Sequence, residues 1–171
     1  MISSRLKNRS LQKKIDKLSK ISSPRNTGRD LKISSVGILS TEGISKMIDL
    51  QDLAISKLYI RNPKIYSYRK YDRGQEVSYK HFSENDFNWR GEVINPSLQS
   101  FIEQPFDMLI CFYEDNNLFL EYVAHESKAN LKVGFAEVHQ KLFDIELLVN
   151  ELQEELFFTE LYKYLNILGK V

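Results

Sequence analysis

The sequence predicts an α/β protein with a three-layer, mainly parallel, Rossmann-like sheet and an N-terminal basic helical extension. Three observations lead to this class. Strand-like and helix-like segments alternate along residues 31–171, which is the pattern of βαβ units. The segment 106–113 (FDMLICFY) is apolar on both faces, as a central strand of a parallel sheet requires. Residues 1–32 carry ten basic and two acidic side chains, a net charge of +8.

The length of 171 residues suits one domain with an appendage. We therefore divide the chain into a basic helical arm with its linker (1–30) and a single α/β domain (31–171). Subtracting the ten and two residues of 1–32 from totals of 24 basic and 23 acidic residues leaves 14 and 21 for 33–171, a net charge of −7. This asymmetry indicates either contact with a polyanion or an anionic surface, or an arm that folds back on the acidic body.

The arm is predicted to form a helix over 4–22, because Leu11, Ile15 and Leu18 recur at helical spacing. The polar stretch 22–30 contains Pro24 and glycine, which indicates a linker. With few apolar residues of its own, the arm is expected to add little to folding.

Strands and helices are predicted to alternate along the domain from its first element. A β-branched segment at 33–39 indicates a strand, a helix follows over 44–60, and alternating residues at 64–71 indicate a second strand. Residues 72–95 have no sustained period and are expected to form an irregular connection with short strands or turns. The remaining elements are a helix at 96–103, a strand at 106–113, a helix at 116–127, strands at 131–135 and 143–149, and a helix at 151–168.

The C-terminal helix is expected to bury a stripe of leucines at helical spacing. The stripe consists of Leu152, Leu156, Leu161, Leu165 and Leu168.

Cysteine content and hydropathy limit the classes of protein further. The single Cys111 excludes an internal disulfide, and no Cys/His spacing indicates a zinc site. The N-terminus lacks the apolar segment of a secretory signal, and the longest apolar run is too short to cross a bilayer. We expect a cytoplasmic protein without metal, cofactor or disulfide partner.

A ligand crevice is one candidate site, because open α/β sheets bind ligands beyond the carboxyl ends of their strands. The loop Ser40-Thr41-Glu42-Gly43 matches no phosphate-binding motif, and capping of the next helix by Thr41 is the favoured explanation of these residues. An enzyme that binds a nucleotide or sugar nucleotide here is an alternative hypothesis, but no catalytic signature supports it. The candidate crevice residues are Ser40, Thr41, Gly43, Tyr113, Glu114 and Glu137.

A second candidate is a group of tyrosines interleaved with basic residues. Such a pattern suits base stacking and phosphate contacts, but it is also typical of an ordinary half-buried strand. The group comprises Tyr66, Tyr68, Tyr71 and Tyr79, with Lys64, Arg69, Lys70, Arg73 and Lys80.

The leading hypothesis is a non-enzymatic binding protein whose basic arm docks on RNA, such as ribosomal RNA. The alternative partner is an anionic membrane surface or a protein groove, which would bury the apolar positions Leu6, Leu11, Ile15, Leu18 and Ile21. The predicted phosphate contacts are Arg5, Lys7, Arg9, Lys13, Lys14, Lys17, Lys20, Arg25 and Arg29.

Two resemblances rest on longer segments. The segments FNWRGE, PFDMLICFYEDNNLFLEYVAHESKANLKVGF, FDIELLV and YKYLNILGKV resemble an uncharacterised family of small Bacteroidota proteins known as a domain of unknown function, which implies no activity. The buried D-x-L-I strand, the helix and the K-V-G-F strand are similar to the N-terminal Rossmann-like half of heptosyltransferase-type glycosyltransferases. Because the half that binds the sugar nucleotide is absent, this similarity implies the fold and not the reaction.

Overall fold

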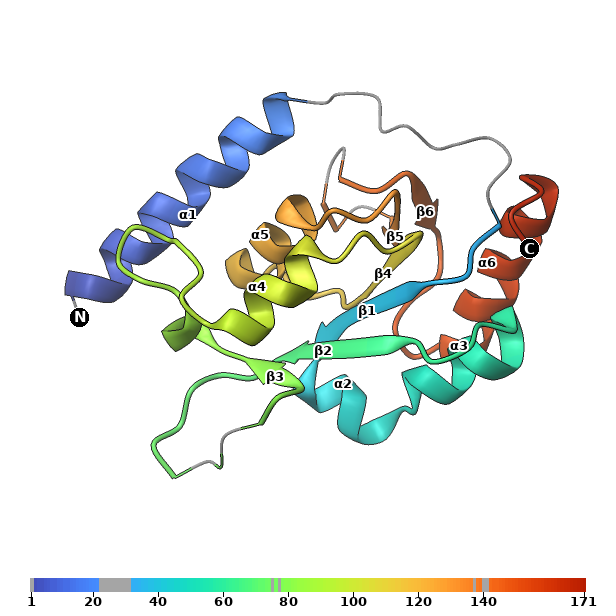
Figure 1. The fold of residues 1–171 in the computed structure, drawn as a ribbon, viewed down its shortest axis with the longest axis horizontal. Helices are drawn as coiled ribbons and strands as arrows, with labels where there is room; N and C mark the ends of the chain where they lie inside the picture. The colour runs from blue at the N-terminus through green and yellow to red at the C-terminus, as the bar shows by residue number, and fades with distance from the viewer. Residues whose placement is uncertain (1, 22–31, 75, 77, 137, 140–141) are drawn as a thin grey trace.

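A parallel sheet organises the protein, whose computed structural model describes residues 2–21, 32–74, 76, 78–136, 138–139 and 142–171 (Figure 1). In the described residues, six strands form one all-parallel sheet in the order β3-β2-β1-β4-β5-β6. The strands are β1 (Val36–Thr41), β2 (Lys64–Tyr68), β3 (His81–Phe82), β4 (Met108–Phe112), β5 (Leu131–Phe135) and β6 (Ile145–Leu147). This order is the one found in dinucleotide-binding Rossmann domains. The predicted Rossmann-like class is confirmed.

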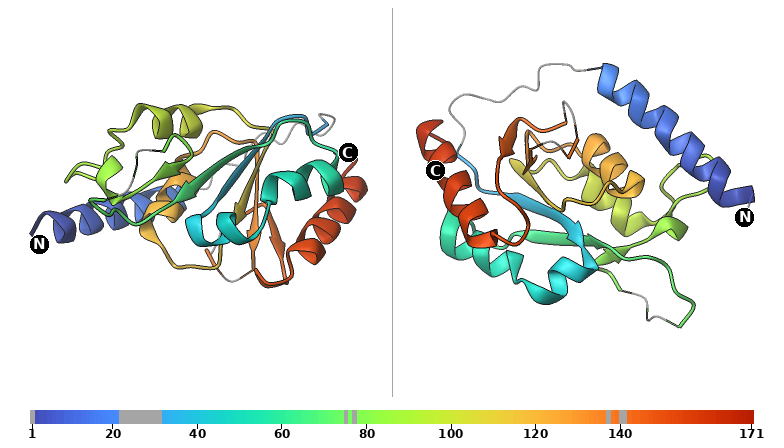
Figure 2. Two further views of the ribbon diagram at one scale, coloured as in Figure 1. Left: turned by 90° about the horizontal axis from the view of Figure 1, so that it is seen from below. Right: turned by 180° about the vertical axis from the view of Figure 1, so that it is seen from behind.

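Helices cover both faces of the sheet (Figures 1 and 2). On one face α3 packs against α6, and on the other α4 packs against α5. The helix α1 lies along α5, outside that second layer. The helices are α1 (Ile2–Lys20), α2 (Glu42–Met47), α3 (Leu50–Leu58), α4 (Pro96–Glu103), α5 (Leu118–Glu126) and α6 (Glu154–Ile167), with a short 3₁₀ helix at Glu84–Asp86.

The strand β4 is buried along its whole length between β1 and β5. Asp107, just before β4, accepts hydrogen bonds from the backbone N–H and the hydroxyl of both Ser34 and Ser35, at 2.8–3.0 Å. Burial acts to raise the pKa of Asp107, but these hydrogen bonds outweigh it and lower that pKa below its ordinary value. The carboxylate therefore ties the beginning of β4 to the segment that leads into β1.

The helix predicted over 44–60 is two helices, because the chain breaks at its middle. Ile48 is extended and closes α2, and the carboxylate of Asp49 accepts a hydrogen bond from Asp52 N at 2.9 Å as the N-cap of α3. An aspartate cap competes with helix continuation, which the apolar spacing alone did not reveal.

The predicted leucine stripe of α6 is wrong in part. Leu161 and Leu165 are fully buried, but Leu152, Leu156 and Leu168 are 82, 41 and 49% exposed. Two adjacent phenylalanines, Phe157 and Phe158, fill the core in their place, and both rings lie beside Phe112 of β4. Aromatic area rather than leucine periodicity determined which side of α6 faces the sheet.

The N-terminal helix contributes to the core. Leu11 is 0% and Ile15 is 3% exposed, and both belong to the main hydrophobic cluster. Gly91 has φ +68°, and a Cβ there would lie 3.1 Å from the Leu11 side chain, so α1 and this loop fit closely. The expectation that the arm adds little to folding is therefore wrong for α1. The boundary at residues 30 and 31 stays a prediction, since 22–31 lie outside the described residues.

Replacing Leu11 with alanine is expected to lower the free energy of unfolding by about 2–5 kcal/mol, because it removes a fully buried side chain. Leu6→Ala on the same helix is the matched control, since Leu6 is 47% exposed, and it should cost less than about 1 kcal/mol. Urea denaturation measures both. Equal costs would show that α1 does not pack on the domain in solution.

Leu161→Ala in α6 is expected to be similarly costly, about 2–5 kcal/mol, because Leu161 is fully buried. Leu152→Ala should change the free energy of unfolding by less than about 0.5 kcal/mol, because most of its side chain is already in water. A larger loss for Leu152 than for Leu161, by the same denaturation measurement, would contradict this orientation of α6.

Candidate functional site

The basic residues of α1 divide between two sides of the helix. Lys7 Nζ donates a hydrogen bond to the backbone oxygen of Glu84 at 2.6 Å, and Lys14 Nζ donates to the backbone oxygen of Gly91 at 2.9 Å. Lys14 also lies 5.7 Å from the ring centroid of Tyr122. These two lysines belong to the packing of α1 and are not part of an outward surface.

The other five basic residues of α1 are exposed and form what we call the cationic face. They succeed one another at intervals of three or four residues, which places them on one side of a helix about 6 Å apart along its axis. Among the described residues, no carboxylate forms an ion pair with them. The cationic face consists of Arg5, Arg9, Lys13, Lys17 and Lys20.

Two further predicted phosphate contacts, Arg25 and Arg29, lie outside the described residues. The structure therefore brings together five of the nine residues predicted for RNA contact. It assigns two, Lys7 and Lys14, to internal contacts. Helical spacing is a signal for this division, since it places Lys7 and Lys14 on the same side as Leu11.

The predicted crevice residues at the carboxyl ends of β1 and β4 serve mostly structural roles. Ser40 is fully buried, and its hydroxyl donates to the backbone oxygen of Phe112 at 2.8 Å. Thr41 Oγ1 accepts a hydrogen bond from Ile44 N at 3.3 Å as the N-cap of α2. Gly43 is exposed and follows this cap. The interpretation of Thr41 as a capping residue is confirmed.

Tyr113 and Glu114, the two remaining crevice residues that the structure describes, differ in their exposure to solvent. Tyr113 is 1% exposed and its ring lies 5.7 Å from that of His139, and burial raises the pKa of Tyr113 well above its ordinary value. Burial disfavours the charged form of His139 as well, and because that form is the protonated one, the pKa of His139 is lowered to about 4. Glu114 is exposed and accepts a hydrogen bond from Glu151 N at 3.1 Å. Glu137 lies outside the described residues.

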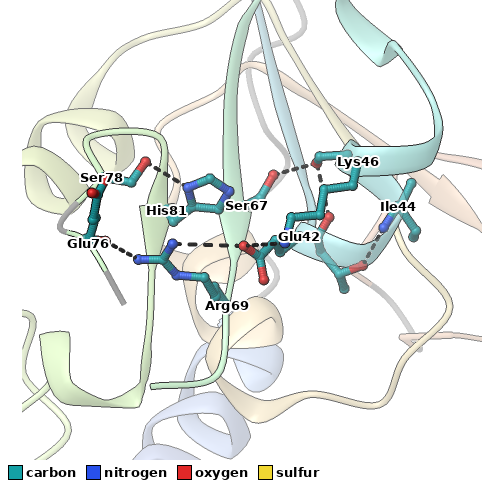
Figure 3. A network of polar contacts seen from close by, with 10 residues as sticks. Glu42, Ile44, Lys46, Ser67, Arg69, Glu76, Ser78 and His81 are labelled. Atoms are coloured by element: carbon teal, nitrogen blue, oxygen red, sulfur yellow. Dashed lines mark hydrogen bonds and ion pairs between the residues drawn. The ribbon is translucent and has the colours of Figure 1, made fainter. Parts of the chain in front are cut away.

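A polar network lies at the carboxyl ends of β1 and β2, where Figure 3 shows Lys46 and Arg69 directed at the carboxylate of Glu42. The distances to Glu42 Oε1 are 3.1 Å from Lys46 Nζ and 3.8 Å from Arg69 Nη1. Arg69 also donates to the backbone oxygen of Glu76 at 2.8 Å. The i,i+4 spacing of Glu42 and Lys46 is a local signal that was not used, whereas the approach of Arg69 from a distant segment has no signal in the sequence.

Hydroxyl groups continue the network onto β3. Ser45 Oγ donates to the backbone oxygen of Thr41 at 2.9 Å and lies 2.6 Å from Ser67 Oγ. His81 Nδ1 lies 2.7 Å from Ser78 Oγ (Figure 3). Burial first, and then the positive charge of Arg69, lower the pKa of His81 below its ordinary value.

Tyr66 and Tyr68 are ordinary strand residues, as one of the two interpretations of the tyrosine group predicted. Their rings contact Phe82, at centroid distances of 5.8 and 5.6 Å. Tyr71 and Tyr79 are instead 49 and 83% exposed.

The fold defines the protein as a Rossmann-like α/β domain with an added N-terminal helix. The model of a family of unknown function, DUF6913, matches residues 7–168, and the chain belongs to this family. The predicted membership of an uncharacterised family is thereby confirmed. No curated protein and no solved structure matches the chain significantly.

Two structural features are absent from the described residues. None of their helices is both long and apolar enough to pass through a bilayer. In that same part of the chain, no group of three or more histidine, cysteine or acidic side chains is arranged to hold a metal ion.

Arg69→Gln is expected to raise the pKa of His81 toward 6.5, because a nearby positive charge that disfavours the imidazolium is removed. NMR titration of the imidazole measures the change. Arg90→Gln is the control, since Arg90 stacks on Trp89 at 4.7 Å and is not among the charges that act on His81. An unchanged titration in Arg69→Gln would contradict the network.

Proposed function

We propose that this protein is a non-enzymatic, cytoplasmic RNA-binding protein that contacts phosphates through the cationic face of α1. One observation carries the proposal. The apolar side of α1 is used in packing on the domain, which leaves Arg5, Arg9 and Lys13 on the opposite side with Lys17 and Lys20. A folded domain thus presents a row of cations on a rigid helix, and such a row neutralises phosphates without reading bases.

The net charge of residues 33–171 favours binding of a polyanion at α1 over binding elsewhere on the chain. Residues 33–171 carry a net charge of −7, so a polyanion is repelled by most of the domain and attracted to α1. An extended polyanion such as RNA matches a row of charges about 22 Å long, estimated from a rise of 1.5 Å per residue.

The membrane and protein-groove alternatives lose support from the same packing. Both need the apolar side of α1 as a contact surface, but Leu11 and Ile15 are buried against the domain. The described apolar residues of the helix region that remain exposed are Leu6 and Ile21, at 47 and 59%. Two separated side chains make a weak apolar anchor.

The finer resemblances stay predictions. An origin in Bacteroidota, ribosome association and similarity to heptosyltransferase-type glycosyltransferases are not needed for the proposal. We propose no transferase activity, because Ser40 and Thr41 at the predicted crevice already serve the fold.

RNA binding should depend on the cationic face. Fluorescence anisotropy with a labelled RNA hairpin is expected to give a slope of log affinity against log salt near −3.5 to −4.5 for five phosphate contacts. The double variant Arg9→Gln/Lys13→Gln should reduce the magnitude of the slope by about 1.4–1.8, because two counterion-releasing contacts are removed.

The control for this experiment is Lys128→Gln/Lys163→Gln, which removes the same charge from exposed positions outside α1. It should keep most of the affinity. Equal losses in the two double variants would indicate a non-specific charge effect, and absence of binding by the wild-type chain would overturn the proposal. Thermal unfolding midpoints confirm that all variants remain folded.

A further inference from the structure

A pocket of about 590 Å³ lies beside the outer edge of β2, between this strand and α4. It exists because β3 pairs only with Ser67 and Tyr68, so the first half of β2 pairs with β1 on its inner side and has no described strand on its outer side. The volume lies within the range of small-ligand sites, about 300–1,000 Å³. The pocket is separate from the cationic face and from the carboxyl-end network.

The charge of the pocket wall differs from that of the domain as a whole. The described residues that line it include Lys64 and Lys80 but no aspartate or glutamate. Lys64 Nζ donates to Gln104 Oε1 at 2.8 Å, a neutral partner that leaves its charge uncompensated. The backbone oxygen of Lys80 accepts a hydrogen bond from Ser67 N at 2.9 Å, which fixes this residue beside β2. Because residues 33–171 carry a net charge of −7, this cluster of positive charge is a local site for an anion.

Aromatic and hydroxyl groups complete the wall. Tyr79, next to Lys80, is 83% exposed, so its ring is open to a planar partner. Tyr66 is nearly buried, and its ring stacks on Phe101 at a centroid distance of 5.3 Å. Ser97, from α4, adds a hydroxyl near that of Tyr66. The pocket thus combines two cations, an exposed aromatic ring and neutral hydrogen-bonding groups.

We propose that this pocket binds a small monophosphate ester that carries a planar heterocycle, the chemical class of a nucleoside monophosphate. Lys64 and Lys80 bind the phosphate through charge-assisted hydrogen bonds, and the heterocycle stacks on Tyr79. The proposal is independent of RNA binding by α1, because no residue of α1 lines the pocket.

Calorimetric titration of the full chain with AMP and with UMP tests the proposal. Lys80→Gln is expected to weaken AMP binding about tenfold, since it removes a charge-assisted contact. Tyr79→Ala should weaken AMP binding to a similar extent but leave the binding of inorganic phosphate unchanged, because only the stacking surface is lost. Lys163→Gln, on α6, is the matched charge control and should bind AMP like the wild type.

The proposal is overturned if no heat of binding is measured for AMP or UMP at concentrations up to about 10 mM, or if the wild type, Lys80→Gln and Tyr79→Ala bind with equal affinity. Equal affinities for adenosine and AMP would show that the phosphate contributes nothing to binding, and this result would also contradict the proposal. The Arg9→Gln/Lys13→Gln variant should bind AMP normally, so this experiment and the RNA experiment fail or succeed separately.

Discussion

The burial of β4 on both faces is the constraint on which the other elements depend. All five of its residues are buried, so the sheet needs a helical layer on each side. Phe112 packs against Phe157 of α6 on one face of the sheet, while α4 and α5 lie on the other. Hydrogen bonds from Ser34 and Ser35 to Asp107 hold the chain before β1 next to the beginning of this strand. The central pair of strands is thereby fixed by side chains as well as by backbone pairing.

Packing of α1 connects the core to the proposed function. Because Leu11 and Ile15 complete the apolar surface over α5, the helix has one rotational setting on the domain. Lys7 and Lys14, at the margins of this contact, are used as hydrogen-bond donors to loop carbonyls. The same setting that stabilises the helix turns the remaining cations away from an acidic domain. Stability and the direction of the charged surface therefore have one cause.

The charged side chains at the carboxyl ends of the strands and those at the outer edge of β2 differ in how they are paired. At the carboxyl ends of β1 and β2, Lys46 and Arg69 both pair with the carboxylate of Glu42, and Thr41 is used as a helix cap. At the outer edge of β2, the short β3 leaves a space whose lysines have no acidic neighbour in the pocket wall. Unpaired charge, rather than the usual ligand position of the fold, distinguishes the candidate binding surfaces.

The sequence by itself determined the type and order of most elements. The helix at 96–103 and the strand at 131–135 occupy their predicted residues, because Pro96 and the alternating apolar residues Leu131, Val133 and Phe135 are local signals. It also determined that the N-terminal segment is a cationic helix, since charge and helical period are read without neighbours.

Only the tertiary structure decided which residues of each helix face the core and which groups meet. Phe157 and Phe158 displaced the expected leucines of α6 because they fit beside Phe112, a residue of a distant strand. Which lysines of α1 face outward depended on the carbonyls of residues 84 and 91. The pocket beside β2 arises where β3 ends its pairing. Each of these outcomes is a contact between segments far apart in the chain, and local periodicity contains no information about such contacts.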